Sequence, residues 1–156
     1  MTGAGRLGAA ALVSALLVLT AGCGDKGESA AEPDAGGDLT AAADTSTCRA
    51  DAHPVTDLPS GYPTDFPLPP GTVVYHVEDR GADGLVATGV TRTAFPDVLS
   101  ALNAAKTAGF KVTEGETEDH DAEANWTGNG YTGRWAIRES SACPGETVIQ
   151  LLSRQG

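Results

Sequence analysis

The densest group of side chains with chemical potential is an acidic cluster around one histidine. Its members are Glu114, Glu116, Glu118, Asp119, His120, Asp121 and Glu123. Carboxylate oxygens and an imidazole nitrogen are ligands that divalent cations accept. However, the cluster lacks the spacing of a calcium loop with its fixed glycine, and no second histidine is close in sequence. We therefore expect a solvated charged segment and no bound metal. The alternative is that the cluster binds a cation, and the candidate ligands are then Glu116, Glu118, His120 and Asp121.

The other two histidines have no catalytic partners near them in the sequence. His53 precedes Pro54, and His76 falls within a β-rich run. The chain also lacks the sequence motifs of the serine-hydrolase elbow, the zinc-protease helix and the phosphate-binding loop. We therefore expect no catalytic residues, no cofactor and no enzyme activity.

Three arginines are the basic residues that could gather on an open face of a sheet: Arg92, Arg134 and Arg138. In an acidic protein, such a group could bind a carboxylate or a phosphate. Cross-strand pairing with Asp and Glu is the interpretation that we prefer. Binding of a small ligand or a divalent cation is thus our alternative function.

The chain has three cysteines, which divide into a pair and a remainder. Cys48 and Cys143 can form a disulfide in an oxidising compartment, and Cys23 is then left over. There is no Cys-x-x-Cys motif and no histidine within four residues of either paired cysteine, which disfavours a redox or metal site. A bridge across a loop of this length stabilises a domain by about 4–5 kcal/mol in the chain-entropy model.

The first 23 residues have the pattern of an export signal. Arg6 is the only charge before Cys23, and an apolar run follows it from 7 to 19. Such a run makes a helix of roughly 20 Å, which is short of the ~30 Å hydrocarbon core of a membrane. A positive start, a short apolar middle and small residues at the end predict a secretory signal.

The residues Leu-Thr-Ala-Gly-Cys at 19–23 resemble the lipobox of bacterial lipoproteins, with Thr20 at a position where leucine is commonest. The resemblance implies that Cys23 carries a diacylglyceryl group on its sulfur and that residues 1–22 are removed. It also implies a second acylation, often seen in the family, at the new amino terminus. The expected location is the extracytoplasmic face of the cell membrane, held by lipid chains. A composition rich in Ala, Gly, Asp and Thr resembles that of small actinobacterial envelope lipoproteins.

The mature chain expected from this cleavage is strongly acidic, with 21 acidic and nine basic residues and a net charge of −12. This charge opposes binding to nucleic acid and to anionic lipid surfaces. The expected partner is another envelope protein or a wall component. The function that we expect is a non-enzymatic interaction or accessory module of the cell envelope.

Composition divides the mature chain into a tether and a domain. Residues 23–47 have one large aliphatic side chain, Leu39, and no aromatic one, so we expect a disordered acidic tether behind the lipidated cysteine. The domain is expected over 48–156. It begins with a Pro-rich lead-in whose aromatic residues, Tyr62 and Phe66, are expected to pack inward.

The remaining patterns predict a small α+β domain. An apolar stripe at helical spacing predicts one helix, which begins at Pro96 and ends at Gly109. Strands are expected over 72–78, 85–93, 122–127, 131–138 and 146–153. A further strand starts at 110–113, and the alternating Glu114, Glu116 and Glu118 could line its wet face before a charged loop. We expect an antiparallel sheet of five to six strands in β-β-α-β-β-β-β order, with the helix on one face and water on the other.

Overall fold

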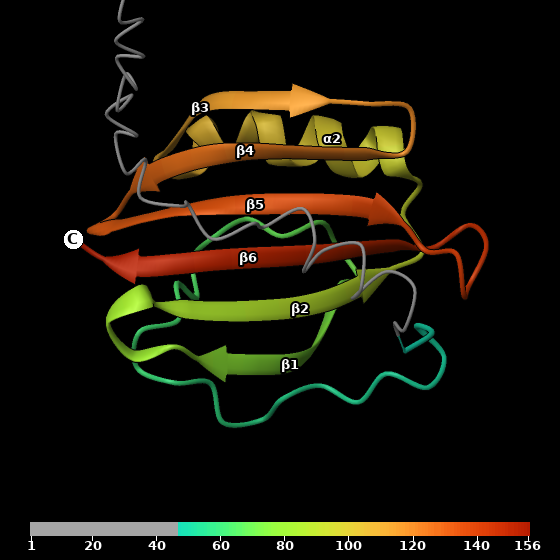
Figure 1. The fold of residues 1–156 in the computed structure, drawn as a ribbon, viewed down its shortest axis with the longest axis horizontal. Helices are drawn as coiled ribbons and strands as arrows, with labels where there is room; N and C mark the ends of the chain where they lie inside the picture. Colours follow the sequence, from blue (N-terminus) through green and yellow to red (C-terminus); the bar gives the residue numbers. More distant parts are fainter. Residues whose placement is uncertain (1–46) are drawn as a thin grey trace, which may run out of the picture. The chain divides into compact units, whose positions relative to one another are not determined.

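The computed structural model describes residues 47–156, which form a six-stranded sheet with one α-helix (Figure 1). All neighbouring strands are antiparallel, and their order across the sheet is β1-β2-β6-β5-β4-β3. Their bounds are β1 Val73–Asp79, β2 Leu85–Thr91, β3 Phe110–Thr117, β4 Asp121–Gly128, β5 Tyr131–Glu139 and β6 Thr147–Gln155. The predicted α+β class is confirmed. The expected signal peptide, Cys23 and all of the expected tether except Thr47 lie outside the described residues.

The helix carries the chain from β2, in one half of the sheet, to the edge strand β3 (Figure 1). Helix α2 spans Phe95–Asn103 and continues as the 3₁₀ helix η2, Ala104–Ala108. Pro96 lies in its first turn, where a missing N–H costs nothing. Gly109, with φ of 89°, ends the segment in the left-handed conformation that glycine favours. The predicted helix is therefore confirmed, with its last turns wound more tightly than expected.

One face of α2 packs against the sheet through Phe95, Val98 and Leu102, which are buried. These residues recur at three- and four-residue spacing, so they form the apolar stripe that the sequence predicted. The core beneath the helix also holds both tryptophans, Trp126 and Trp135, which are 0% and 1% exposed. This face of the sheet therefore supplies the main hydrophobic core.

Gly133 on β5 makes room for one of the tryptophans. A Cβ atom at this position would lie 2.7 Å from Cζ2 of the Trp126 ring and closer still to the backbone oxygen of Leu152. Because no side chain fits between these groups, the indole of Trp126 lies against the bare backbone of β5. The glycine in the middle of a strand thus has a packing role.

The Pro-rich lead-in follows the edge strand β1 and then joins the core. The backbone N–H of Val55 donates to the backbone oxygen of Val74, with an N···O distance of 2.9 Å. Further along, Tyr62 and Phe66 are buried within the core cluster, which confirms the expected inward packing. The Phe66 ring lies 4.7 Å from that of Trp126, between ring centroids. Leu58 is the exception, because 38% of it remains exposed.

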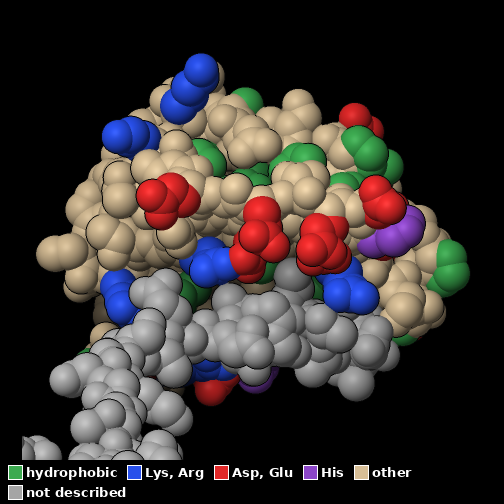
Figure 2. Space-filling model, turned by 45° about the horizontal axis from the view of Figure 1, so that its top comes forward, with side chains coloured by type: hydrophobic (Ala, Val, Ile, Leu, Met, Phe, Trp, Pro, Cys, Tyr) green, Lys and Arg blue, Asp and Glu red, His purple; other side chains and the backbone are tan. Residues whose placement is uncertain are grey.

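Three strand ends lie two or more residues from their predicted positions. β3, which was expected to start at 110–113, continues to Thr117, through exposed residues that pair with β4 after a bulge between Val112 and Gly115. Two of the alternating glutamates, Glu114 and Glu116, therefore lie on this strand. β2 ends at Thr91, and β6 extends to Gln155. Acidic side chains gather on the surface of this β3–β4 part of the sheet (Figure 2).

The face of the sheet away from α2 is less polar than expected. All seven residues of β2 are buried, including Val90, which is opposite Val148 on β6. Both valines are 0% exposed, and Ala136 on β5 is 4% exposed. The same face also carries polar side chains, such as Gln150 on β6 and Arg134 on β5. The expectation that this face is wet therefore holds only for part of it, since Val90, Val148 and Ala136 are buried.

Candidate functional site

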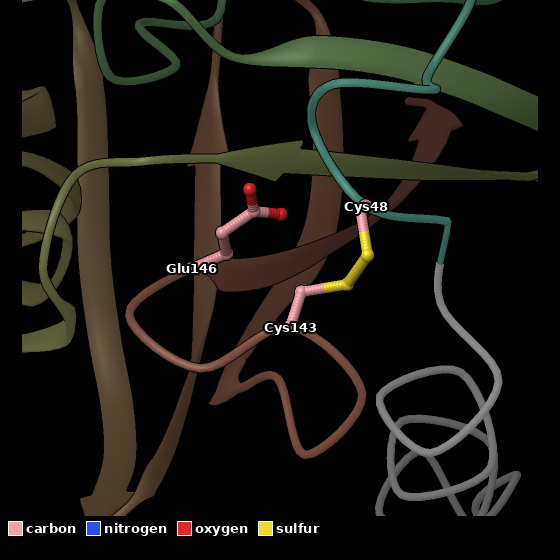
Figure 3. A group of neighbouring side chains, drawn as sticks. All are labelled: Cys48, Cys143 and Glu146. Carbon is pink, nitrogen blue, oxygen red and sulfur yellow. A yellow bond between two sulfur atoms is a disulfide. The ribbon is translucent and has the colours of Figure 1, made fainter.

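The disulfide joins the start of the lead-in to the turn that precedes β6 (Figure 3). Cys48 and Cys143 have their Cα atoms 5.6 Å apart and close a loop with a sequence separation of 95. The predicted pairing is thus present. The backbone N–H of Cys143 also donates to the hydroxyl of Ser140, at 3.1 Å, which fixes the turn from inside.

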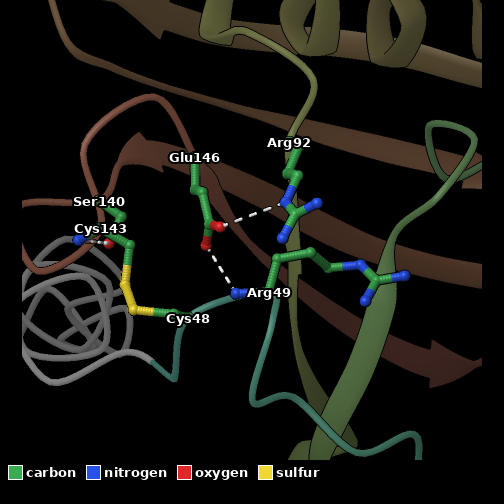
Figure 4. The surroundings of a disulfide bond; sticks show 6 residues. All are labelled: Cys48, Arg49, Arg92, Ser140, Cys143 and Glu146. Atoms are coloured by element: carbon green, nitrogen blue, oxygen red, sulfur yellow. Dashed lines mark hydrogen bonds and ion pairs between the residues drawn. A yellow bond between two sulfur atoms is a disulfide. The ribbon is translucent and has the colours of Figure 1, made fainter.

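Glu146 is the polar centre of this corner (Figure 4). Its Oε2 accepts a hydrogen bond from the backbone N–H of Arg49 at 2.6 Å, and its Oε1 lies 3.7 Å from Nε of Arg92. The Glu146 side chain is 12% exposed. A carboxylate so shielded needs partners for both oxygens, and the two arginines supply them. We call Cys48, Arg49, Arg92, Cys143 and Glu146 the disulfide corner.

A surface pocket of about 370 Å³ opens beside the disulfide corner. Its walls come from three segments: the start of the lead-in, the turn before β1 and the residues after β2. The lining residues are Arg49, Pro70, Gly71, Thr91, Arg92 and Thr93. Among the described residues that line the pocket, two are arginines and none is acidic, so this part of the lining is positive.

Sequence reasoning singled out Arg92, but as part of a group with Arg134 and Arg138 on an open sheet face, and it missed Arg49 and Glu146. Arg49 is 43 positions from Arg92 in the sequence, so no local pattern connects the two. The usable signal was its neighbour Cys48, because the bridge to Cys143 brings Arg49 to the turn that contains Glu146.

The other two candidate arginines lie elsewhere. Arg134 on β5 forms a two-point ion pair with Glu123 on β4, with Nε 3.0 Å from Oε2. This is the cross-strand pairing that we expected for it. Arg138 is at the end of β5, in register with Asp121 and Val148.

The acidic cluster spreads over β3, the β3–β4 turn and β4. His120, in the turn, has Nδ1 3.0 Å from Oε2 of Glu139, and both side chains are at least half exposed. Over residues 47–156, the one group of three or more metal-ligating side chains with ligand atoms within 4.8 Å is Cys48, Cys143 and Glu146. Glu116, Glu118, His120 and Asp121 therefore do not form a ligand set. The sulfur atoms of the other group are bonded to each other.

The remaining histidines belong to other parts of the fold. His53 is exposed in the lead-in, and His76 is exposed on the edge strand β1. His120 is near the opposite edge of the sheet, in the turn between β3 and β4. Among the described residues, the histidines thus belong to three different places.

The pKa values of two tyrosines and one glutamate are shifted from their ordinary values. Burial raises the pKa of Tyr62 above its ordinary value of 10.0, and burial likewise raises the pKa of Tyr75 against a smaller, opposing effect of a backbone hydrogen bond from Thr47. A hydrogen bond from Arg80 lowers the pKa of the exposed Glu78. These groups lie outside the disulfide corner.

Comparison with known proteins assigns neither a family nor a function to the chain. No family model matches the chain, and the searches of curated proteins and of solved structures find no match either. Within the described part of the chain, no helix is long and apolar enough to span a membrane.

Proposed function

We propose that this chain is a lipid-anchored protein of the bacterial cell envelope, and that Cys23 is its lipidation site. The observation that carries the proposal is the short apolar run that ends in small residues and Cys23. The disulfide supports it, since Cys48 and Cys143 use each other and leave Cys23 as the odd cysteine. A disulfide of this kind is typical of proteins exported from the reducing cytoplasm.

The domain then acts by binding and not by catalysis. Its histidines belong to separate parts of the fold. Its acidic cluster is largely exposed: Glu123 pairs with Arg134, and His120 contacts Glu139, which lies outside the cluster. The described residues offer instead a fixed surface: a twisted sheet, a covalently held corner and a positively lined pocket. A role as an interaction or accessory module agrees with these features.

Mass spectrometry of the mature amino terminus tests the anchor. The expected species begins at Cys23 and carries a diacylglyceryl group. A Cys23→Ala variant should move from the detergent phase to the aqueous phase after phase separation, whereas Cys48→Ser, the matched control, should remain in the detergent phase. An unmodified amino terminus would contradict the proposal.

Crosslinking in intact membranes tests the binding role. The expected result is one envelope partner recovered repeatedly by the wild-type chain under several growth conditions. Recovery of only abundant, variable proteins would contradict a specific interaction.

A further inference from the structure

We infer that the pocket beside the disulfide corner binds a phosphate-type oxyanion. The inference goes beyond the proposed function, because it depends on residues of the domain and not on the lipid anchor. It starts from the lining, in which residues 47–156 supply two arginines and threonine hydroxyls and no acidic side chain.

Arg49 is fixed at three points before any ligand arrives. Its neighbour Cys48 is bonded to Cys143, its backbone N–H donates to Glu146, and its side-chain Nε donates to the backbone oxygen of Gly71 at 2.9 Å. Within residues 47–156, its two terminal Nη atoms have no hydrogen-bond partner. A guanidinium held at Nε with both Nη atoms available is oriented in advance, which lowers the entropic cost of binding an anion.

Arg92 brings the second guanidinium to the same pocket. Its side chain is 70% exposed, and its contact with Glu146 is a long one at 3.7 Å. Figure 4 shows the guanidinium groups of Arg49 and Arg92 on the same side of the Glu146 carboxylate. Since one glutamate faces two arginines, the corner keeps a formal charge of +1. Over residues 47–156 as a whole, 15 acidic and eight basic residues give a net charge of −7.

Thr93 supplies a third donor. Its hydroxyl oxygen accepts a hydrogen bond from the Thr91 hydroxyl at 3.1 Å, while its backbone N–H donates back to the Thr91 oxygen at 3.2 Å. The hydroxyl proton of Thr91 is therefore already used in the hydrogen bond to Thr93, and the hydroxyl proton of Thr93 is available to donate to a ligand. The backbone oxygen of Thr93 is held by the hydroxyl of Thr147 at 3.0 Å, which fixes this segment against β6.

The donors match the chemistry of a terminal phosphate. The two arginines and the Thr93 hydroxyl come from two segments of the chain, one with Arg49 and the other with Arg92 and Thr93. Three donors correspond to the three oxygens of a phosphate better than to the two oxygens of a carboxylate. The pocket is open to solvent and larger than a lone phosphate needs. A phosphate carried on glycerol or a sugar therefore fits as well as the free ion.

Titration of the full-length protein in a neutral detergent with inorganic phosphate, at constant ionic strength, tests the inference. The readout is the NMR signal of the arginine Nε–H groups. We expect saturable shifts at Arg49 and Arg92. Binding should weaken about tenfold in Arg92→Gln and about threefold in Thr93→Val. Arg92 is chosen because its exposed side chain puts the fold at little risk.

Arg154→Gln is the matched control, since it removes the same charge at a residue outside the pocket lining. It should change the affinity less than twofold. Equal weakening by Arg154→Gln and Arg92→Gln would overturn the inference, as would acetate that binds as tightly as phosphate. Shifts that do not saturate would overturn it too. A second titration with glycerol phosphate identifies the form of phosphate that the site takes. If the site takes a phosphate carried on an organic group, glycerol phosphate binds at least as tightly as inorganic phosphate. If it takes the free ion, only inorganic phosphate binds, and either result supports the oxyanion site.

Discussion

The two ends of the lead-in are fastened to the sheet by opposite means. Its start is held by a covalent bridge and by polar contacts to Glu146, at the surface of the molecule. Its later part is held by Tyr62 and Phe66, which are buried in the aromatic core. The attachment at the start can be weakened by reductants, by a change of charge or by salt. The attachment at Tyr62 and Phe66 can be weakened by removing packed side-chain atoms. The sheet is thus bordered by one segment whose two attachments can be tested separately.

The difference shows where binding chemistry can be located in a small domain. The packed rings of Phe66, Phe110 and Trp126 contact one another and are buried, so they present no donor at the surface to a ligand. The polar attachment, by contrast, leaves two guanidinium groups beside a pocket. The covalent bridge makes this arrangement stable without burying the arginines.

Removing the bridge should have the largest effect. Cys143→Ser is expected to lower the free energy of unfolding by about 4–5 kcal/mol, because the closed loop is long. Urea denaturation with fluorescence detection of the tryptophans measures the change. Cys23→Ala is the control and should leave the midpoint unchanged. A loss below about 1 kcal/mol would show that packing alone holds the lead-in.

Truncating the packed end should cost slightly less. Phe66→Ala removes a ring that contacts Trp126 and Phe110, and we expect a loss of about 3–5 kcal/mol in unfolding free energy. Leu58→Ala, in the same segment but 38% exposed, should change it by no more than about 0.5 kcal/mol. Equal losses in the two variants would contradict the assignment of Phe66 to the core.

Changing the polar contacts should have a smaller effect again. Glu146→Gln keeps one oxygen acceptor for the Arg49 N–H but removes the charge opposite Arg92, so we expect a loss of about 1 kcal/mol. Thermal unfolding at low and high salt measures it. Glu116→Gln, on an exposed part of β3, is the matched control and should have little effect. If both variants behave alike, Glu146 has no special structural role.

The smallest effect concerns pH at the packed end. Because burial raises the pKa of Tyr62 in the folded state, the folded protein binds this proton more tightly than the unfolded chain does. Stability from this group is therefore constant below pH 10 and falls as the pH rises above it. Titration of phenolate absorbance, as the difference between wild type and Tyr62→Phe, should show ionisation above pH 10. An ordinary tyrosine titration would contradict the burial.

Short-range patterns in the sequence were enough to predict most helices and strands of the fold. Proline at the helix start, glycine at its end and the Gly-Asn-Gly turn are short-range features, and Asn129 and Gly130 do adopt positive φ values of 50° and 81°. The alternation of Glu114 and Glu116 indicated that β3 could continue along a wet face, but it did not show where the strand ends. That end is set by the pairing with β4, which reaches Thr117.

The site depended on contacts that the sequence does not display. The disulfide could be predicted by counting cysteines, because Cys23 belongs to the expected lipidation site and only Cys48 and Cys143 remain to pair. The insertion of β6 between β2 and β5, by contrast, depends on pairings across the whole domain. It brings Glu146 beside Arg92, so this contact could not be read from spacing. Arg49 joined the pocket for the same reason.

The position of the bridge also determines how the domain would bear mechanical load. A pull on the chain ahead of Cys48 passes through the two sulfur atoms to Cys143 and from there into β6. The segment from 49 to 142 lies outside this covalent path and takes up load only through the hydrogen bonds of β2 and β5 to β6. β6 is hydrogen-bonded along its length to β2 and β5, so the force meets two ladders loaded in shear. A pull on the chain ahead of Cys48 would thus reach β6 before it reached the lead-in.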